Sequence, residues 1–531
     1  MIRAFVLVAL VLFCSGCSTP APPQPTPSAQ PLDVIELSAA EARDRMAAGR
    51  LTSRALTQAY LDRIAAVDKR GPQLNSVIEL NSRALAEAEA LDAERQSGKT
   101  RGALHGIPVL IKDNIDSVGM VNSAGSLALA DNRPTQDAFL VKRLRDAGAV
   151  ILGKTNLSEW ANFRSTRSTS GWSSRGGQTK NPYVLDRNPC GSSSGTGTAI
   201  AASLAAIGVG TETDGSIICP AAVSGLVGLK PTVGLISRTG VIPISVSQDT
   251  AGPMGRSVTD VAILLNGLAG VDPSDPASAD AAGKIPTDYM AALKSDALQG
   301  KRLGVLRQAM GVHPDLDRAM EAAMERMKAQ GATLVDVKIA TYNNWNNAEF
   351  DVLLYEFKDG LNTYLKASGS PHPTLESLIA WNKANATTVM PFFGQEIFER
   401  AQAKGPLSDA AYVKARTQAR RLAGPDGLIA TLNREKLDAL IAPSMSPAWP
   451  TDHVLGDHFV GGAGYGMAAV AGTPSITVPI GESHGLPLGL TFMGRAYAEA
   501  NLIAMAYSLE QATKARKAPD YKPTLSTEDR K

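Results

Sequence analysis

A loop with three consecutive serines holds the first candidate nucleophiles of this sequence. It is the stretch PCGSSSG at residues 189–195, and its GSSSG part fits the G-x-S-x-G pattern of a nucleophile elbow centred on Ser193. Such an elbow needs a strand that runs directly into the turn, but residues 181–189 hold two prolines and four polar side chains, which disfavour a central strand. An apolar helical segment starts at Thr196, so the loop is held at a helix N-terminus, where free N–H groups orient polar partners.

A second glycine-flanked serine, Ser216, lies in the run TETDGSIICP at residues 211–220. A strand-like stretch ending at Val209 leads into this run, and Pro220 suits the first turn of a following helix. Four consecutive backbone N–H groups of the turn can converge on a developing oxyanion, those of Thr213, Asp214, Gly215 and Ser216. A turn with a purely structural role explains the same residues, so the sequence leaves both interpretations open.

A lysine is the candidate base. Lys112 ends the apolar strand Val109–Ile111 and is followed by Asp113 and Asn114. A lysine at a strand end is ordinarily a surface residue whose ammonium reaches solvent. If it is buried, it can be neutral and act as a base. Moving its pKa from about 10.4 to about 7 requires about 4.6 kcal/mol, which burial under helices at the end of a sheet can supply.

Short apolar runs alternate with helical segments along most of the chain, which is the pattern of an α/β fold. Helical spacing runs from Leu37 to Arg95, and a helix of small residues covers Thr196–Ile207. The strand candidates are Ile107–Ile111, Ala149–Leu152, Ile207–Val209, Arg302–Leu306, Ala439–Ala442 and Ser475–Pro479. Residues 271–300 have the composition of a linker, but strands resume beyond them. We therefore expect one large domain around one sheet, with residues 310–430 as a helical cap.

Composition excludes several classes of function. Of the 531 residues, 44% are hydrophobic and 20% charged, and the net charge of +2 gives no reason to expect a nucleic acid partner. Four cysteines are too few for a disulfide-built scaffold. The six histidines show no HExxH spacing, and His453 and His458 are interpreted as loop residues, so we expect no metal and no cofactor.

The N-terminus has the pattern of a bacterial export signal. Arg3 precedes the ten-residue apolar run Ala4–Phe13, which is too short to span a membrane but suits a signal peptide. The run CSGC at residues 14–17 resembles a lipobox with Cys17 as the lipidated residue, although Cys14 stands where leucine is usual. Release as a soluble secreted protein is the alternative.

This pattern predicts an exported protein of the bacterial cell envelope, anchored to the membrane by lipid at Cys17. The expected organisation is a signal peptide (1–16), a Pro-rich tether (17–34), the folded domain (35–515) and a C-terminal tail (516–531). We expect no obligate protein partner.

Together these motifs resemble the amidase signature family over about residues 36–515. The likeness is densest over residues 189–232, with further matches at GALHGIPVLIKDN (102–114), GKTN (153–156) and AGTPSITVP (471–479). Within the family the sequence is most similar to the bacterial peptide amidases. The resemblance implies an α/β amidase-signature fold with a single large mixed sheet covered by helices on both faces.

The resemblance also assigns roles to the site residues. The family uses a Ser–cis-Ser–Lys triad whose nucleophile lies 24 residues beyond the bridging serine, which implies Ser216 as nucleophile and Ser192 as bridge. Ser192 would follow a cis peptide bond from Gly191, and neutral Lys112 would be the base. The turn residues Thr213, Asp214 and Gly215 would bind the oxyanion. Cys190, Ser194 and Thr196 depart from the usual family loop but leave the three catalytic positions intact.

The expected reaction is the hydrolysis of an amide to an acid plus ammonia, with peptides or N-acyl amino acids bearing a C-terminal carboxamide as substrates. Fatty or aryl amides or esters are the alternative substrates for the same triad. The same motifs also serve a tRNA-dependent amidotransferase subunit, and the signal and fold class also suit an extracytoplasmic peptide-binding lipoprotein. Specificity is expected to depend on residues 310–460. Cys190 and Cys219 flank the two serines, and we expect buried free thiols rather than a disulfide.

Overall fold

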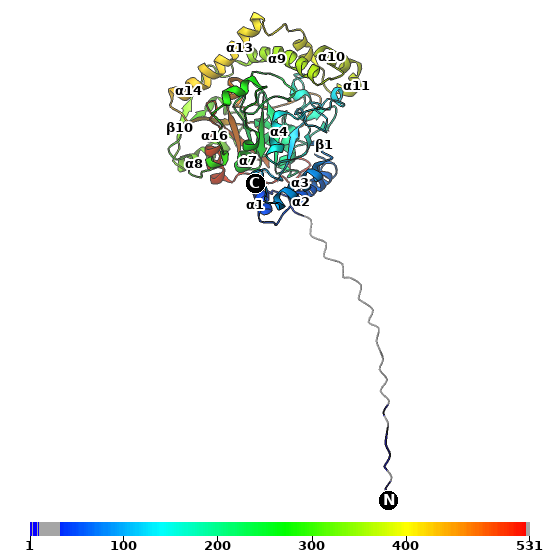
Figure 1. Ribbon diagram of the computed structural model, residues 1–531. Helices are drawn as coiled ribbons and strands as arrows, with labels where there is room; N and C mark the ends of the chain where they lie inside the picture. Colours follow the sequence, from blue (N-terminus) through cyan, green and yellow to red (C-terminus); the bar gives the residue numbers. More distant parts are fainter. Residues whose placement is uncertain (3, 8, 10–31, 527–531) are drawn as a thin grey trace. The chain divides into compact units, whose positions relative to one another are not determined.

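The computed structural model describes residues 1–2, 4–7, 9 and 32–526 (Figure 1). The chain divides into two compact units, Met1–Leu32 and Asp33–Lys531. The second unit carries the helices and strands. Cys17 and all but three residues of the predicted tether lie outside the described residues.

The second unit is built on an eleven-stranded mixed sheet with the strand order β1-β3-β2-β6-β8-β7-β12-β13-β11-β9-β10. Strand β2 runs parallel to both of its neighbours, β3 and β6, whereas β6 is antiparallel to β8. The strands are β1 (Val77–Leu80), β2 (Pro108–Lys112), β3 (Val150–Thr155), β6 (Ile207–Glu212), β7 (Val227–Lys230), β8 (Thr250–Gly255), β9 (Arg302–Leu306), β10 (Thr333–Val337), β11 (Ala439–Pro443), β12 (Ser475–Ser483) and β13 (Leu486–Met493). Strands β4 (Trp172–Ser173) and β5 (Gly177–Gln178) form a separate hairpin.

Helices cover the sheet. Helices α5 and α6 pack on each other and on the central strands, and Gly208 of β6 faces Thr196 and Ile200 of α5. Helix α7 packs on β6, β7 and β8 and contacts α1, α4 and α16. The helices are α1 (Ala39–Ala47), α2 (Ser53–Arg63), α3 (Ala84–Gln96), α4 (Phe139–Asp146), α5 (Ser194–Ala201), α6 (Ile218–Val223), α7 (Val258–Leu268), α8 (Pro314–Ala329), α9 (Asn346–Ala367), α10 (Leu375–Ala384), α11 (Ala386–Val389), α12 (Glu396–Gln402), α13 (Ala410–Ala423), α14 (Ile429–Arg434), α15 (Gly466–Ala471) and α16 (Glu499–Thr513). The predicted α/β fold with one large mixed sheet is confirmed.

The cap begins later in the chain than predicted. The segment 310–430 includes α8 and β10, and β10 is the edge strand of the sheet beside β9. The cap proper runs from α9 to α13, and Figure 1 shows α9, α10, α11 and α13 grouped on the side away from α1–α3. Its apolar core contains Leu354 and Phe398 and packs against Phe163, Ile242 and Ile244, which lie outside the cap. The cap is therefore held over one region of the sheet by burial of apolar surface.

One other prediction needs correction. The helical spacing from Leu37 to Arg95 is interrupted by β1, because four residues leave the helical path to pair with β3 at the edge of the sheet. Residues 271–300, which have the composition of a linker, pack on the rest of the second unit, and Tyr289 and Leu298 are buried there. The local periodicity of the sequence shows neither the pairing of β1 with β3 nor the burial of residues in the segment 271–300.

Candidate active site

Lys112 is buried at the end of β2, so the surface interpretation of this lysine is excluded. Its side chain is 0% exposed, and Nζ lies 2.7 Å from Ser192 Oγ and 2.9 Å from Thr211 Oγ1. Burial lowers the pKa of Lys112 from 10.5 to about 7, although the charges of Asp249 and Glu212 oppose this shift. A lysine with this pKa is largely neutral at slightly alkaline pH, when it can accept a proton.

The serine loop is fixed between β6 and the start of α5. The peptide bond between Gly191 and Ser192 is cis, as the resemblance implied. Ser193 contributes to the fixed position of the loop: its N–H donates to Ser216 O at 3.2 Å, and its hydroxyl donates to Thr211 O at 3.0 Å. The Ser193 hydroxyl is thus hydrogen-bonded within the protein, which argues against Ser193 as an elbow nucleophile.

Ser216 lies on the turn between β6 and α6. The turn is held by Glu212, whose carboxylate accepts the N–H groups of Ile217 at 2.7 Å and Ile218 at 2.9 Å. Gly215 has φ +79°, and a Cβ there would collide with the ring of Tyr465. The role of Glu212 was missed in the sequence, where the only signal was its place next to the TDGS turn.

The predicted oxyanion residues come together on this same turn. Thr213 and Asp214 line the cavity that contains Ser216. Thr213 Oγ1 donates to Asp249 at 2.6 Å, which fixes the turn to the segment before β8.

Cys190 and Cys219 form a disulfide, so the prediction of two free thiols is wrong. Their Cα atoms are 6.0 Å apart, within the range that a disulfide spans. The hydrogen bond from Ser193 N to Ser216 O explains the proximity, because it holds the two serine segments side by side. The bridge thus links the segment of Ser192 to that of Ser216 covalently.

A cavity of about 220 Å³ opens in front of Ser216. Its walls are mostly apolar and come from segments far apart in the chain, among them Phe163, Ile244, Leu353, Met445, Trp449, Phe459 and Tyr465, with the carboxylates of Asp214 and Asp457. Most of these residues carried no recognisable sequence signal. Leu353, from α9, and the loop of residues 445–465 fall within the segment expected to set specificity.

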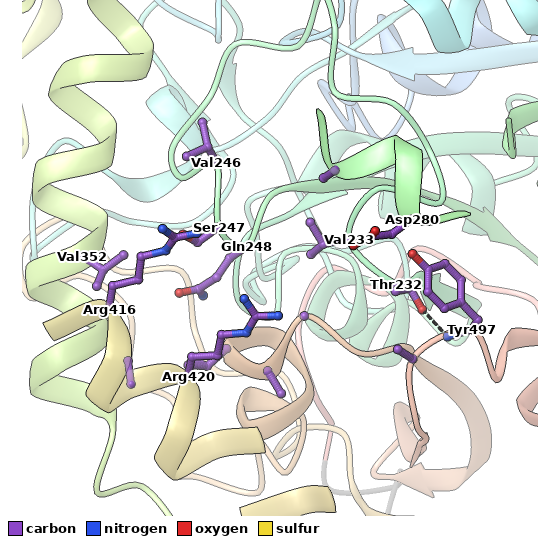
Figure 2. Close-up of a pocket in the computed structure, with 16 residues that line it drawn as sticks. Thr232, Val233, Val246, Ser247, Gln248, Asp280, Val352, Arg416, Arg420 and Tyr497 are labelled. Atoms are coloured by element: carbon purple, nitrogen blue, oxygen red, sulfur yellow. Dashed lines mark hydrogen bonds between the residues drawn. The ribbon is translucent and has the colours of Figure 1, made fainter. Parts of the chain in front are cut away.

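A second cavity, of about 260 Å³, is a separate feature of the molecule. Figure 2 shows Arg416 and Arg420 of α13 directed into it, with Gln248 close to the two arginines and Tyr497 on the opposite side. Its walls include neither Ser192 nor Ser216, and they do not include Lys112. Gln248 donates to Thr213 O at 3.3 Å and to Glu349 at 2.9 Å, so this side chain stands between the second cavity and the oxyanion turn. The cavity that contains Ser216 is therefore the candidate active site.

Comparison with known proteins identifies the family. A family model described as Amidase matches residues 55–503. A probable amidase of Arabidopsis thaliana is 40% identical over 485 residues, which are 89% of this chain and 89% of the relative. A putative amidase of Schizosaccharomyces pombe is 34% identical over 534 residues, covering 94% of this chain and 88% of the relative. The chain therefore belongs to the amidase signature family.

Solved structures define the relationship further. The native peptide amidase from Stenotrophomonas maltophilia is 53% identical, with a TM-score of 0.88 over 92% of this chain and 99% of that chain. A structure of peptide amidase in complex with the competitive inhibitor chymostatin is 54% identical, with a TM-score of 0.90 over the same shares. The protein is an enzyme that hydrolyses amide bonds, with close structural similarity to peptide amidase.

The comparisons contradict the predicted location. The matched relatives include amidases of a plant and a fission yeast, and their similarity supports the amidase domain but not an anchor. On these findings the prediction of a lipid-anchored protein of the bacterial envelope is wrong. It rested on a short apolar run and on Cys17, a pattern too short to be specific. As a separate finding, no helix in the part of the chain that the structure describes has the length and apolar character needed to cross a membrane.

In the same described part, no group of three or more His, Cys, Asp or Glu side chains is arranged to hold a metal ion.

Proposed function

We propose that the protein hydrolyses C-terminal carboxamides of peptides or N-acyl amino acids, using Ser216 as nucleophile, Ser192 as proton bridge and Lys112 as base. The catalytic unit is the domain of residues 35–515. The observation that carries the proposal is the 2.7 Å contact between Lys112 Nζ and Ser192 Oγ, on a loop hydrogen-bonded to the segment of Ser216.

In this mechanism Ser216 Oγ adds to the amide carbonyl carbon. Its proton passes to Ser192 as Ser192 gives its own proton to the neutral amine of Lys112. N–H groups of the turn Thr213–Ser216 stabilise the oxyanion. Ser192 then protonates the leaving nitrogen, ammonia departs, and water releases the acid from the acyl-enzyme.

Two observations support a peptide or N-acyl amino acid as the acyl group. The cavity in front of Ser216 has room for an amino acid side chain, and its apolar and aromatic walls favour an apolar one. The solved peptide amidase that binds chymostatin shares 54% of its residues with this chain. By contrast, the bacterial aryl acylamidase matched here is 23% identical, which relates the two proteins by fold alone.

The test is a panel of primary amides with release of ammonia as the readout. The panel contains N-acetylated dipeptide amides, a fatty amide and an anilide, and mass spectrometry checks whether internal peptide bonds stay intact. We expect turnover of the dipeptide amides, its loss in Ser216→Ala, and retention of most of it in Ser193→Ala. Cleavage restricted to the fatty amide or the anilide would refute the substrate assignment.

A further inference from the structure

A very small cavity lies on the side of Ser192. It adjoins the cavity of about 220 Å³ in front of Ser216, which is called the large cavity from here on. Its volume is about 10 Å³, and its wall includes Ser192, whereas Ser216 lies in the wall of the large cavity. The two cavities share Ala161, Thr213 and Ile244 in their walls, so they are neighbours. The space around the two candidate serines is thus divided into a large compartment and a small one.

Asn114, a residue in the wall of the small cavity, carries a buried polar atom without a partner. Asn114 is 4% exposed, and its Oδ1 makes no hydrogen bond. The rest of the residue is fixed, because Nδ2 donates to Thr211 Oγ1 at 3.0 Å and the backbone oxygen accepts from Ile242 N at 2.8 Å. A buried acceptor left unpaired costs about 1–3 kcal/mol, so its presence here points to a donor that arrives with the substrate.

The carboxylate in the same wall is already occupied. Asp249 accepts from Thr213 Oγ1 at 2.6 Å and from the N–H groups of Ile244 and Ser245, both at 2.8 Å. Of the two side chains, Asn114 is therefore the one whose oxygen makes no hydrogen bond within the protein.

We infer that the small cavity binds the leaving nitrogen of the substrate and limits the leaving group to ammonia, an inference that rests on the proposed function. If the acyl group occupies the large cavity beside Ser216, the nitrogen that Ser192 protonates must lie on the Ser192 side. There Asn114 Oδ1 accepts one N–H of the carboxamide and orients the nitrogen lone pair toward the Ser192 hydroxyl.

The protons balance in the step that releases ammonia. The addition of Ser216 leaves Lys112 protonated and the intermediate with an NH₂ group. Ser192 gives its proton to this nitrogen and takes one from Lys112. The C–N bond then breaks with its electron pair on nitrogen, the carbonyl reforms, and neutral ammonia remains in the small cavity.

The size of the cavity sets the selectivity. A volume of about 10 Å³ holds a single molecule the size of water or ammonia. Its apolar wall includes Val241, Ile242 and Ile244, which are at most 8% exposed. A methyl group on the leaving nitrogen adds a heavy atom for which this wall leaves no room, and the cap packs behind Ile242 and Ile244.

The experiment compares two substrates that differ by one methyl group, an N-acetyl dipeptide amide and its N-methylamide. For the wild type we expect kcat/KM for the N-methylamide to be at least about tenfold lower. Ile242→Ala removes part of the cavity wall. It should reduce the ratio of kcat/KM for the primary amide to kcat/KM for the N-methylamide about tenfold. Ile397→Ala is the matched control, because Ile397 belongs to the same apolar cluster but does not line either cavity, so the ratio should stay unchanged. If Ile242→Ala does not fold, Ile242→Val should reduce the ratio by a smaller factor.

Asn114 is tested with the same pair. In Asn114→Ala, kcat/KM for the primary amide should fall about tenfold or more, while the N-methylamide loses less, because the variant removes the acceptor and also enlarges the cavity. An equal loss for both substrates would mean that Asn114 only holds Thr211 and Lys112 in position, which overturns its binding role.

The outcomes separate this inference from the proposed function. Equal wild-type rates for the amide and the N-methylamide would overturn the inference and leave the proposed function intact. An unchanged ratio in folded Ile242→Ala would overturn the role of the cavity wall. Absence of turnover with every primary peptide amide would refute the proposed function itself.

Discussion

Replacing Lys112 by methionine separates the catalytic cost of the change from its effect on stability. The variant Lys112→Met keeps a long side chain at the end of β2 but removes the amine that lies 2.7 Å from Ser192 Oγ. We expect turnover to be lost, because Ser192 then has no base to which it can pass the proton of Ser216. The free energy of unfolding should change in a direction that depends on pH.

The size of the pH effect follows from the pKa of Lys112. Burial lowers it from 10.5 to about 7, which is about 3.5 pKa units or about 5 kcal/mol. The unfolded chain binds the proton more tightly than the folded protein, so wild-type stability falls as pH falls from 10.5 to 7. Below pH 7 the full loss is present, because the folded protein must also bury the ammonium.

A second effect of the substitution does not depend on pH. Removing Nζ takes away the hydrogen bonds that Lys112 donates to Ser192 Oγ and to the backbone oxygen and Oγ1 of Thr211. Each group left unpaired costs about 1–3 kcal/mol. The absolute stability difference between variant and wild type therefore combines two opposing contributions. Its change between pH 9.5 and pH 7 reports the lysine alone and should be about 3 kcal/mol in favour of the variant at pH 7.

Urea unfolding of both proteins at pH 7 and pH 9.5 measures this change. Lys414→Met, at an exposed position on α13, is the control and should show no such change. In the wild type, kcat/KM should fall about tenfold per pH unit below pH 7, because protonated Lys112 accepts no proton. The Asp249 carboxyl, whose pKa burial raises to about 6, adds a second titration only at lower pH. A pH-independent stability difference together with a flat rate profile from pH 5.5 to 8.5 would refute a neutral lysine base.

Three further predictions concern the serines, the disulfide and the glycine turn. Ser216→Ala should lower kcat at least about 10³-fold. Adding Ser192→Ala should lower kcat little further, because the two serines act as one unit. Single-turnover assays measure both losses, and additive losses would contradict this prediction. The disulfide closes a loop with a sequence separation of 29, so its reduction should destabilise the protein by about 3–4 kcal/mol. Thermal unfolding with and without reductant measures this effect, and the double variant Cys190→Ser, Cys219→Ser should not respond to reductant. Gly215→Ala should abolish most turnover, whereas Gly98→Ala should not, although both glycines have φ near +80°. At Gly98 an added Cβ meets no atom within 4 Å, but at Gly215 it meets Tyr465, so equal activity of the two variants would exclude the Tyr465 contact as the cause.

The roles of the candidate catalytic residues came from the resemblance to the amidase signature family, and their positions share one feature, because each lies near the end of an element. Lys112 ends an apolar strand, Ser192 lies before a helix of small residues, and Ser216 lies on a strand-to-helix turn. Such positions leave a local pattern in the sequence. The pairing of β2 with β6 then brings the ends of two of these elements together, which a parallel sheet does at one edge.

Other features depend on contacts that no local pattern records. The Cys190–Cys219 bridge was not predicted, because a preference for free thiols says nothing about two segments held together by a hydrogen bond from Ser193 to Ser216. Glu212 could only be recognised once its carboxylate was seen to accept the N–H groups at the start of α6. The export prediction failed for the opposite reason, since it relied on a short local pattern alone.

The walls of the two compartments show why substrate choice was harder to predict than chemistry. The large cavity takes its wall from the cap helix α9 and from the loop 445–465, whereas the small one is closed by residues 241–250. The cap contacts both, because Leu353, Ile242 and Ile244 belong to one apolar cluster. Substitutions in the cap can therefore alter the acyl group that fits while Ser192, Ser216 and Lys112 stay in place. On this reasoning acyl specificity varies with the cap, and the restriction to ammonia varies with the segment behind Ser192.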